Sequence, residues 1–198
     1  HYKGVGAELV KEDVHTQGHC ALNPRSFREK DYTAIPVSEP KKIAVIGGGI
    51  GGMTVAIQSA KRGHDVVIYE KSDELGGVFI AAAAPSFKEK DKDLIAWYRR
   101  QIDKMKIPVR FNTEIKDLSE IKADEIVIAT GAKPRQLKLN TAPDAVEVVE
   151  AIEYLRGYKE VGDTVAIIGG GLTGCEIAYD LALKGKRAIV IEMMDDIL

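Results

Sequence analysis

From Lys41 onward, short runs of β-branched and other apolar residues alternate with stretches whose apolar positions recur at helical spacing. Strands and helices that alternate in this way predict an α/β fold built on a parallel sheet. Several runs are apolar at consecutive positions, which is typical of parallel strands covered on both faces. The predicted strands are residues 43–46, 66–69, 109–112, 125–129, 165–168 and 188–191.

Between the second and third predicted strands, residues 88–106 have the pattern of an amphipathic helix. The charged run at 89–93 is then the solvated start of that helix. Residues 1–40 show no such periodicity and hold three of the seven prolines, so we expect them to form an extended arm. The apolar face of the predicted helix consists of Ile95, Tyr98, Ile102 and Met105.

The chain contains an internal repeat. Residues 45–70 align without a gap on residues 167–192, at a constant offset of 122. Each copy consists of a predicted strand, a glycine-rich turn, a helix and a second strand. Solenoid repeats run to roughly 20–50 residues, so a repeat of this length instead predicts two related nucleotide sites.

Each copy carries the spacing G-x-G-x-x-G directly after its first strand. In such a turn the first glycine allows the tight bend, the second lets the backbone approach a pyrophosphate, and the third lets helix and strand pack closely. The helix that begins there offers unpaired N–H groups and the positive end of its dipole to phosphate. The motif glycines are Gly47, Gly49 and Gly52 in the first copy and Gly169, Gly171 and Gly174 in the second.

An acidic residue follows the second strand of the first copy and of the second, 18 positions after the last motif glycine. These residues, Glu70 and Glu192, can accept hydrogen bonds from a ribose diol and would repel a 2′-phosphate. Glu192 is followed by Met193 and Met194 and not by arginine, which favours NADH over NADPH at the second site. The alternative is that the glycines only make tight turns and the glutamates are solvated strand ends. The occurrence of all these elements twice weighs against it.

Two further small-residue motifs follow the first copy, Gly76-Gly77 and Ala129-Thr130-Gly131. The glycine pair permits close approach of the backbone to a ligand, and the second motif makes a turn after an apolar strand. Both are therefore predicted to lie near a cofactor.

Composition excludes several classes of function. Lys and Arg total 28 against 30 Asp and Glu, so the chain lacks the basic surplus of a nucleic-acid binder. No apolar run approaches the roughly 20 residues that cross a bilayer.

The two cysteines, Cys20 and Cys175, are too few for a disulfide framework and fit a reducing cytoplasm. They form no C-x-x-C pair, which argues against a disulfide reductase or thioredoxin reductase. Cys175 aligns with Met53 and is interpreted as a small buried residue.

The order of these motifs resembles that of the two-dinucleotide-binding flavoproteins. Two segments, Cys20-Ala-Leu-Asn23-Pro24 and Ala84-Pro85-Ser86-Phe87-Lys88, make residues 20–198 similar to the C-terminal half of 2-enoate reductases and related NADH:flavin oxidoreductases. 2,4-Dienoyl-CoA reductase and trimethylamine dehydrogenase share this layout more distantly. The resemblance implies a Rossmann-like FAD/NAD(P)-binding fold in a cytoplasmic enzyme. It further implies that NADH gives hydride to FAD, and that electrons continue through a 4Fe-4S cluster to FMN in an N-terminal barrel, which reduces an activated carbon–carbon double bond.

The resemblance also implies roles for individual residues, by motif matching. Glu176 resembles a residue near the contact of flavin and nicotinamide, and its alternative is a partly exposed helix glutamate. The implied FAD residues are Gly47, Gly49, Gly51, Gly52, Glu70, Lys71, Gly77 and Val78, with Ala129, Thr130 and Gly131 near the flavin. The implied NADH residues are Gly169, Gly171, Gly174 and Glu192.

Cys20 matches the last cluster ligand of that family. A 4Fe-4S cluster needs four thiolates, and residues 1–19 contain no cysteine, so this chain alone is not expected to build it. His15, His19 and Cys20 would need at least one more ligand to bind zinc.

The expected domains are an arm at 1–40 left from the iron–sulfur region, the first segment of an FAD-binding domain at 41–140, and a linker with the start of an NAD(H)-binding domain at 141–198. The second dinucleotide unit is expected to be incomplete, because two strands are too few for an independent sheet. We therefore expect a fragment with weakened FAD retention, whose partners are NADH and the N-terminal FMN barrel of a longer parent. No nucleic-acid or membrane partner is expected, and a homo-oligomer is compatible with the sequence. The alternative function is a dinucleotide-binding module without turnover.

Overall fold

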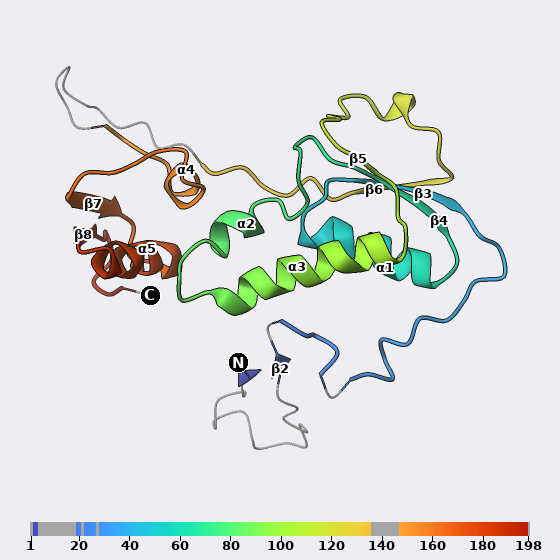
Figure 1. Ribbon diagram of the computed structural model, residues 1–198, viewed down its shortest axis with the longest axis horizontal. Coiled ribbons are helices and arrows are strands. Elements are labelled where there is room, and N and C mark those ends of the chain that lie inside the picture. The colour runs from blue at the N-terminus through green and yellow to red at the C-terminus, as the bar shows by residue number, and fades with distance from the viewer. Residues whose placement is uncertain (1, 4–18, 21, 27, 136–146, 198) are drawn as a thin grey trace. The chain divides into compact units, whose positions relative to one another are not determined.

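The computed structural model of the chain describes residues 2–3, 19–20, 22–26, 28–135 and 147–197 (Figure 1). These residues divide into two compact units. One holds the described residues up to Gly76 together with Asp93–Thr130, and the other holds Gly77–Lys92 with the described residues from Gly131 onward. The segment Gly77–Lys92, which lies between the two parts of the first unit in sequence, therefore belongs to the unit that contains the second glycine turn.

The first unit is built on a four-stranded parallel sheet with the order β5-β4-β3-β6. Central strand β3 pairs with β4 and β6, so that Val45 lies opposite Ile68 on one side and Val127 on the other. This order confirms the predicted parallel sheet. The strands are β3 (Lys42–Ile46), β4 (Asp65–Tyr69), β5 (Val109–Arg110) and β6 (Glu125–Ile128), and a 3-10 turn at Leu118–Glu120 precedes β6.

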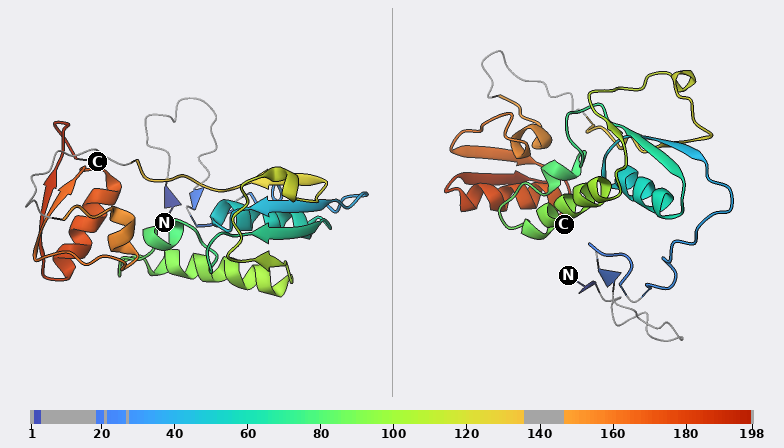
Figure 2. Two further views of the ribbon diagram at one scale, coloured as in Figure 1. Left: turned by 90° about the horizontal axis from the view of Figure 1, so that it is seen from above. Right: turned by 45° about the vertical axis from the view of Figure 1, so that its right-hand side comes forward.

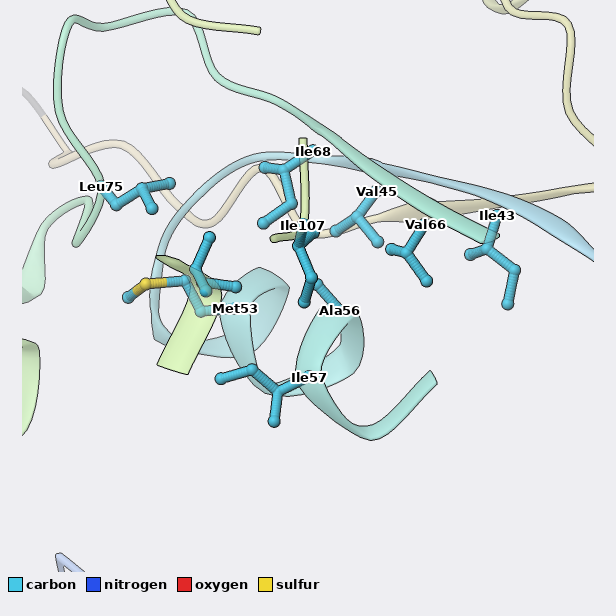
Figure 3. Close-up of a cluster of buried hydrophobic side chains, with 10 residues drawn as sticks. Ile43, Val45, Met53, Ala56, Ile57, Val66, Ile68, Leu75 and Ile107 are labelled. Carbon is cyan, nitrogen blue, oxygen red and sulfur yellow. The ribbon is translucent and has the colours of Figure 1, made fainter. Parts of the chain in front are cut away.

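The core of this unit lies between the sheet and helix α1 (Ile50–Lys61), as Figure 3 shows. Helix α3 (Glu89–Lys104) buries Ile95 and Ile102, while Tyr98 and Met105 pack against the core cluster. The predicted apolar face of this helix is thus confirmed. The labelled side chains of the core are Ile43, Val45, Met53, Ala56, Ile57, Val66, Ile68, Leu75 and Ile107.

Five of the six predicted strands match the observed ones to within one residue at either end. The prediction of a strand at 109–112 is wrong beyond Arg110. Asn112 has a left-handed φ of 51°, and its N–H donates to the carbonyl of Ser72 at 2.9 Å. The chain therefore leaves the sheet two residues earlier than its composition suggests.

In its described part, the second unit contains two parallel strands, β7 (Thr164–Ile168) and β8 (Arg187–Ile191), joined by helix α5 (Leu172–Leu183). Helix α5 packs on one face of the pair (Figure 2). Burial alternates along both strands, and the face opposite α5 exposes Ile168, Ile189 and Ile191. The continuous apolar runs predict that both faces of these strands are covered. Within the described residues, this prediction is wrong for β7 and β8.

Two short helices of this unit, α2 (Phe79–Ala82) and α4 (Ala151–Leu155), contact each other. Neither is predicted from the sequence, because about one turn of helix is too short to show a 3.6-residue period.

Before β3, strand β1 (Tyr2–Lys3) pairs antiparallel with β2 (His19–Cys20). The described residues that follow β2 form turns. Two hydrogen bonds join this segment to the end of α1, from the Val37 N–H to the Arg62 carbonyl at 3.0 Å and from the Arg62 Nε to the Ile35 carbonyl at 3.2 Å.

Candidate functional site

The first glycine turn connects β3 to α1, and two of its glycines are required by the protein's own packing. Gly47 has a φ of +107°, and a Cβ placed on it would stand 2.3 Å from the Ala129 carbonyl oxygen. A Cβ on Gly52 would stand 1.9 Å from the carbonyl oxygen of Gly47. These contacts explain the first and third glycines of the motif without any ligand.

Gly49 and Gly51 are different, because a Cβ on either would meet nothing within 4 Å. Gly49 caps α1 with φ −71° and ψ −177°, an extended conformation open to any residue. Neither packing nor backbone geometry therefore requires glycine at position 49. A ligand that approaches the N-terminus of α1 closely would require it, as a pyrophosphate does.

The second turn, between β7 and α5, repeats this division. Gly169 has a φ of +110°, and a Cβ on Gly174 would again lie 1.9 Å from the carbonyl oxygen of the first glycine. Gly171 caps α5 with φ −73° and ψ 179°, and a Cβ there would meet nothing within 4 Å. The middle glycine of both turns thus faces open space at a helix N-terminus.

Glu70, which follows β4, holds the first turn together. Its carboxylate is buried and accepts hydrogen bonds from the Gly48 N–H at 2.6 Å, the Ser72 N–H at 2.8 Å and the Ser72 hydroxyl at 2.7 Å. A carboxylate has about four acceptor positions. Three of these positions are therefore taken by the protein, and Glu70 orients the turn.

Glu192 holds the second turn in the same way. Its carboxylate accepts from the Gly170 N–H at 2.6 Å and from the N–H groups of Met193 and Met194 at 2.8 and 3.0 Å. The N–H groups of Gly170, Met194 and Met193 stabilise the ionised form and lower the pKa of Glu192. The carboxylate is thus kept charged at the second turn.

The other sequence-predicted residues of the first site divide between the two units. Ala129 lies against Gly47, Thr130 follows it, and Lys71 is exposed after β4. Gly77 and Gly131, with φ values of +57° and +73°, belong to the second unit, as does exposed Val78.

Glu176 lies on the first turns of α5 and forms an ion pair with Lys88 at 2.6 Å. The two side chains are only 26% and 17% exposed, so this is the most buried Lys–Glu pair among those the structure describes. The ring of Phe87 lies 5.0 Å from that of Tyr179, also on α5. Residues 87–88 therefore pack along α5, a contact that motif reading missed because 88 positions separate the paired residues.

Cys20 accepts hydrogen bonds from the backbone N–H groups of Leu22 and Asn23, which lower its pKa. The chain has one other cysteine, so its thiols do not fit the needs of a 4Fe-4S cluster. Among the residues that the structure describes, no group of three or more His, Cys, Asp or Glu side chains is placed to hold a metal. His15 lies outside the described residues. No helix in the described segments has the length and apolarity to cross a membrane.

Curated relatives at 30–40% identity include reductases, an oxidase and a dehydrogenase. Cinnamate reductase of Clostridium sporogenes is 39% identical over 181 residues, which are 90% of this chain and 27% of that protein. NADH oxidase of Thermoanaerobacter brockii is 36% identical over 90% of this chain and 28% of its own length. The chain thus spans just over a quarter of the length of these two relatives.

A solved structure of 2-naphthoyl-CoA reductase in complex with 2-naphthoyl-CoA matches 90% of this chain and 28% of its own, with a TM-score of 0.81 and 36% identity. The model of the family described as pyridine nucleotide-disulphide oxidoreductase matches residues 41–198. These findings confirm the α/β dinucleotide-binding fold, the resemblance to 2-enoate reductases, and FAD and NAD(H) as the cofactors that such a domain implies. The chain belongs to the pyridine nucleotide-disulphide oxidoreductase family.

Proposed function

We propose that this chain is the electron-input module of an NADH:flavin oxidoreductase of the ene-reductase type. FAD binds at the first glycine turn and NADH at the second, and the bound cofactors supply the hydride chemistry while the protein positions them. The longer protein then reduces an activated carbon–carbon double bond. Two relatives, named as reductases of cinnamate and of 2-naphthoyl-CoA, support this choice of substrate class.

The observation that carries the proposal is the open space beside Gly49 and Gly171. Each sits at the N-terminus of a 12-residue helix, where the first N–H groups have no intrahelical acceptor. Neither has a packing or backbone reason to be glycine. Two such glycines, each in a turn whose backbone is held by a carboxylate, are better explained by two bound dinucleotides than by two turns that serve only the fold.

The second site is proposed to select NADH. Glu192 is held ionised by three backbone N–H groups, so it would repel a 2′-phosphate, and the two methionines that follow offer no positive charge. Glu176 is proposed to act where nicotinamide meets flavin, with Lys88 fixing its carboxylate.

The remaining parts of the electron path belong to the longer parent. We propose that an N-terminal barrel with FMN and a 4Fe-4S cluster precedes this module, that Cys20 supplies the cluster's last thiolate, and that the protein works in the cytoplasm. The domain limits proposed from the sequence are 1–40, 41–140 and 141–198.

The test is anaerobic titration of the FAD-loaded chain with NADH, followed by loss of the flavin's visible absorbance. We expect bleaching by NADH and at least about tenfold weaker response to NADPH, a difference worth ~1.4 kcal/mol. Gly171→Ala should raise the NADH concentration needed for bleaching and leave bound FAD in place, whereas Gly49→Ala should weaken FAD itself. A chain that binds FAD but is not bleached would instead be a binding module without turnover.

A further inference from the structure

We propose that Arg99 is a positioning residue for the first glycine turn, an inference that rests on the proposed FAD site. Arg99 lies on α3, and none of the motifs includes it. Its Nε donates to the Leu75 carbonyl at 2.9 Å, and its Nη2 donates to the same carbonyl and to the Glu74 carboxylate, the latter at 2.8 Å. One guanidinium therefore holds two consecutive residues of the loop that follows Glu70.

That loop supports the glycine turn directly. The Gly76 N–H donates to the Gly48 carbonyl at 2.8 Å, and Gly49 and Gly76 form a parallel bridge. The buried side chain of Leu75 lies so close to Gly48 that a Cβ there would stand 2.4 Å from its Cδ2. Displacing residues 74–76 would therefore displace the backbone on both sides of the position that a pyrophosphate would approach.

The guanidinium suits this task because of its shape. Its rigid fork presents parallel N–H groups, so one group can hold a carbonyl oxygen and a carboxylate at fixed angles. Lysine would bring the charge on a flexible stem, without the fork. The position of the 74–76 loop thus depends on the geometry of the side chain as well as on its charge.

In the second copy, the position that corresponds to Leu75 is Ile197. Ile197 follows Glu192 by five positions, as Leu75 follows Glu70, and its side chain would likewise meet a Cβ on Gly170, at 2.7 Å. Leu75 is 6% exposed and Ile197 is 53% exposed. Within the described residues, no arginine or lysine bonds to the Ile197 carbonyl. Among the described residues, this guanidinium contact is therefore found at the proposed FAD turn.

The test compares Arg99→Gln with Arg100→Gln in the full chain. Arg100 is the exposed neighbour on the same helix, so both variants lose one positive charge. We expect Arg99→Gln to raise the dissociation constant for FAD about tenfold or more and to speed amide exchange at residues 47–49 and 76 in the cofactor-free chain. Arg100→Gln should do neither. Arg99→Lys should restore FAD affinity only in part, and Glu74→Gln should change it little, since the Leu75 carbonyl remains held.

The two measurements distinguish a failure of the proposed FAD site from a failure of the role proposed for Arg99. If the unaltered chain bound no FAD, the proposed function would fail, and amide exchange at the turn would still decide the role of Arg99. Equal behaviour of Arg99→Gln and Arg100→Gln in both measurements would overturn the inference. So would accelerated exchange throughout the β3–β6 sheet, or full recovery with Arg99→Lys, because either result would mean that Arg99 contributes general stability or charge and not the position of the loop.

Discussion

The two glycine turns have nearly the same local geometry but lie in very different surroundings. In both copies the N–H of the first motif glycine donates to a β-strand carbonyl at 2.8 Å. The glutamate accepts from the N–H of the next residue, Gly48 or Gly170, at 2.6 Å in both. Strand β3 is buried at every position after its first, whereas burial in β7 alternates. The motif therefore determines the turn, and neighbouring strands determine how deeply the turn is buried.

The two helices that begin at these turns are secured by different means. On α1, Met53 and Ile57 are buried in the apolar core, but the aligned residue of Ile57 on α5 is Tyr179, which is 54% exposed. Helix α5 buries Ile177 and Leu181, and it also buries Asp180, whose carboxylate accepts from the Tyr154 hydroxyl at 2.7 Å and from the Lys184 ammonium at 2.6 Å. A polar cluster thus joins α4 to α5 in addition to the apolar contacts of α5.

The largest expected difference between the copies is in the strands. Val45→Ala, in the fully buried centre of β3, should lower the free energy of unfolding by about 2–3 kcal/mol. Val190→Ala removes the same atoms from half-buried β8 and should cost about 1 kcal/mol. Urea denaturation with amide exchange in each unit measures both values. Equal costs would show that the second copy is packed as tightly as the first.

The turns, by contrast, should respond alike. Gly52→Ala and Gly174→Ala each place a Cβ 1.9 Å from a carbonyl oxygen, so each should destabilise its unit by about 2 kcal/mol. The control is Gly51→Ala, which meets nothing within 4 Å and should be neutral or slightly stabilising, because alanine is the better helix former. Thermal melting tests this. A much smaller cost at Gly174 would mean that burial, and not the motif, holds the turn in shape.

A smaller effect is expected at the polar cluster of α5. Tyr154→Phe removes only the hydroxyl that donates to Asp180 and should cost about 1 kcal/mol. Tyr158→Phe removes the same atom from a side chain that is 67% exposed and should stay within about 0.5 kcal/mol of the unaltered chain. Equal melting temperatures for the two variants would contradict the role assigned to the cluster.

The sequence predicts the repeated parts of this fold well, because periodicity and glycine spacing are local properties. The bounds of five strands, the apolar face of α3 and the two turns all follow from residues less than about 20 positions apart. What it does not reveal are contacts between distant segments. Arg99 bonds to a carbonyl that lies 24 positions away in the sequence. Lys88 forms an ion pair with Glu176 at a separation of 88 positions, and Asp180 accepts a hydrogen bond from Tyr154 at a separation of 26. Nor does an apolar strand pattern say whether a second face is covered, as Ile168 and Ile191 show.

The smallest effect concerns Glu192 and pH. Its folded-state pKa lies below the ordinary value of 4.5, because the N–H group of Gly170 and those of Met194 and Met193 favour the carboxylate. A lowered pKa means that the ionised group stabilises the folded turn above about pH 4.5 and that this contribution is lost as the pH falls through the folded value. Melting of the second unit should therefore decline between pH 5 and pH 3 (~1 unit either side of that value) more steeply in the unaltered chain than in Glu192→Gln. Asp195→Asn, which removes an exposed carboxylate three positions further on, is the control and should keep the steeper decline. Parallel curves for Glu192→Gln and the unaltered chain would show that the three N–H bonds do not hold the carboxylate in solution. The second turn would then differ from the first in its carboxylate hydrogen bonds as well as in its burial.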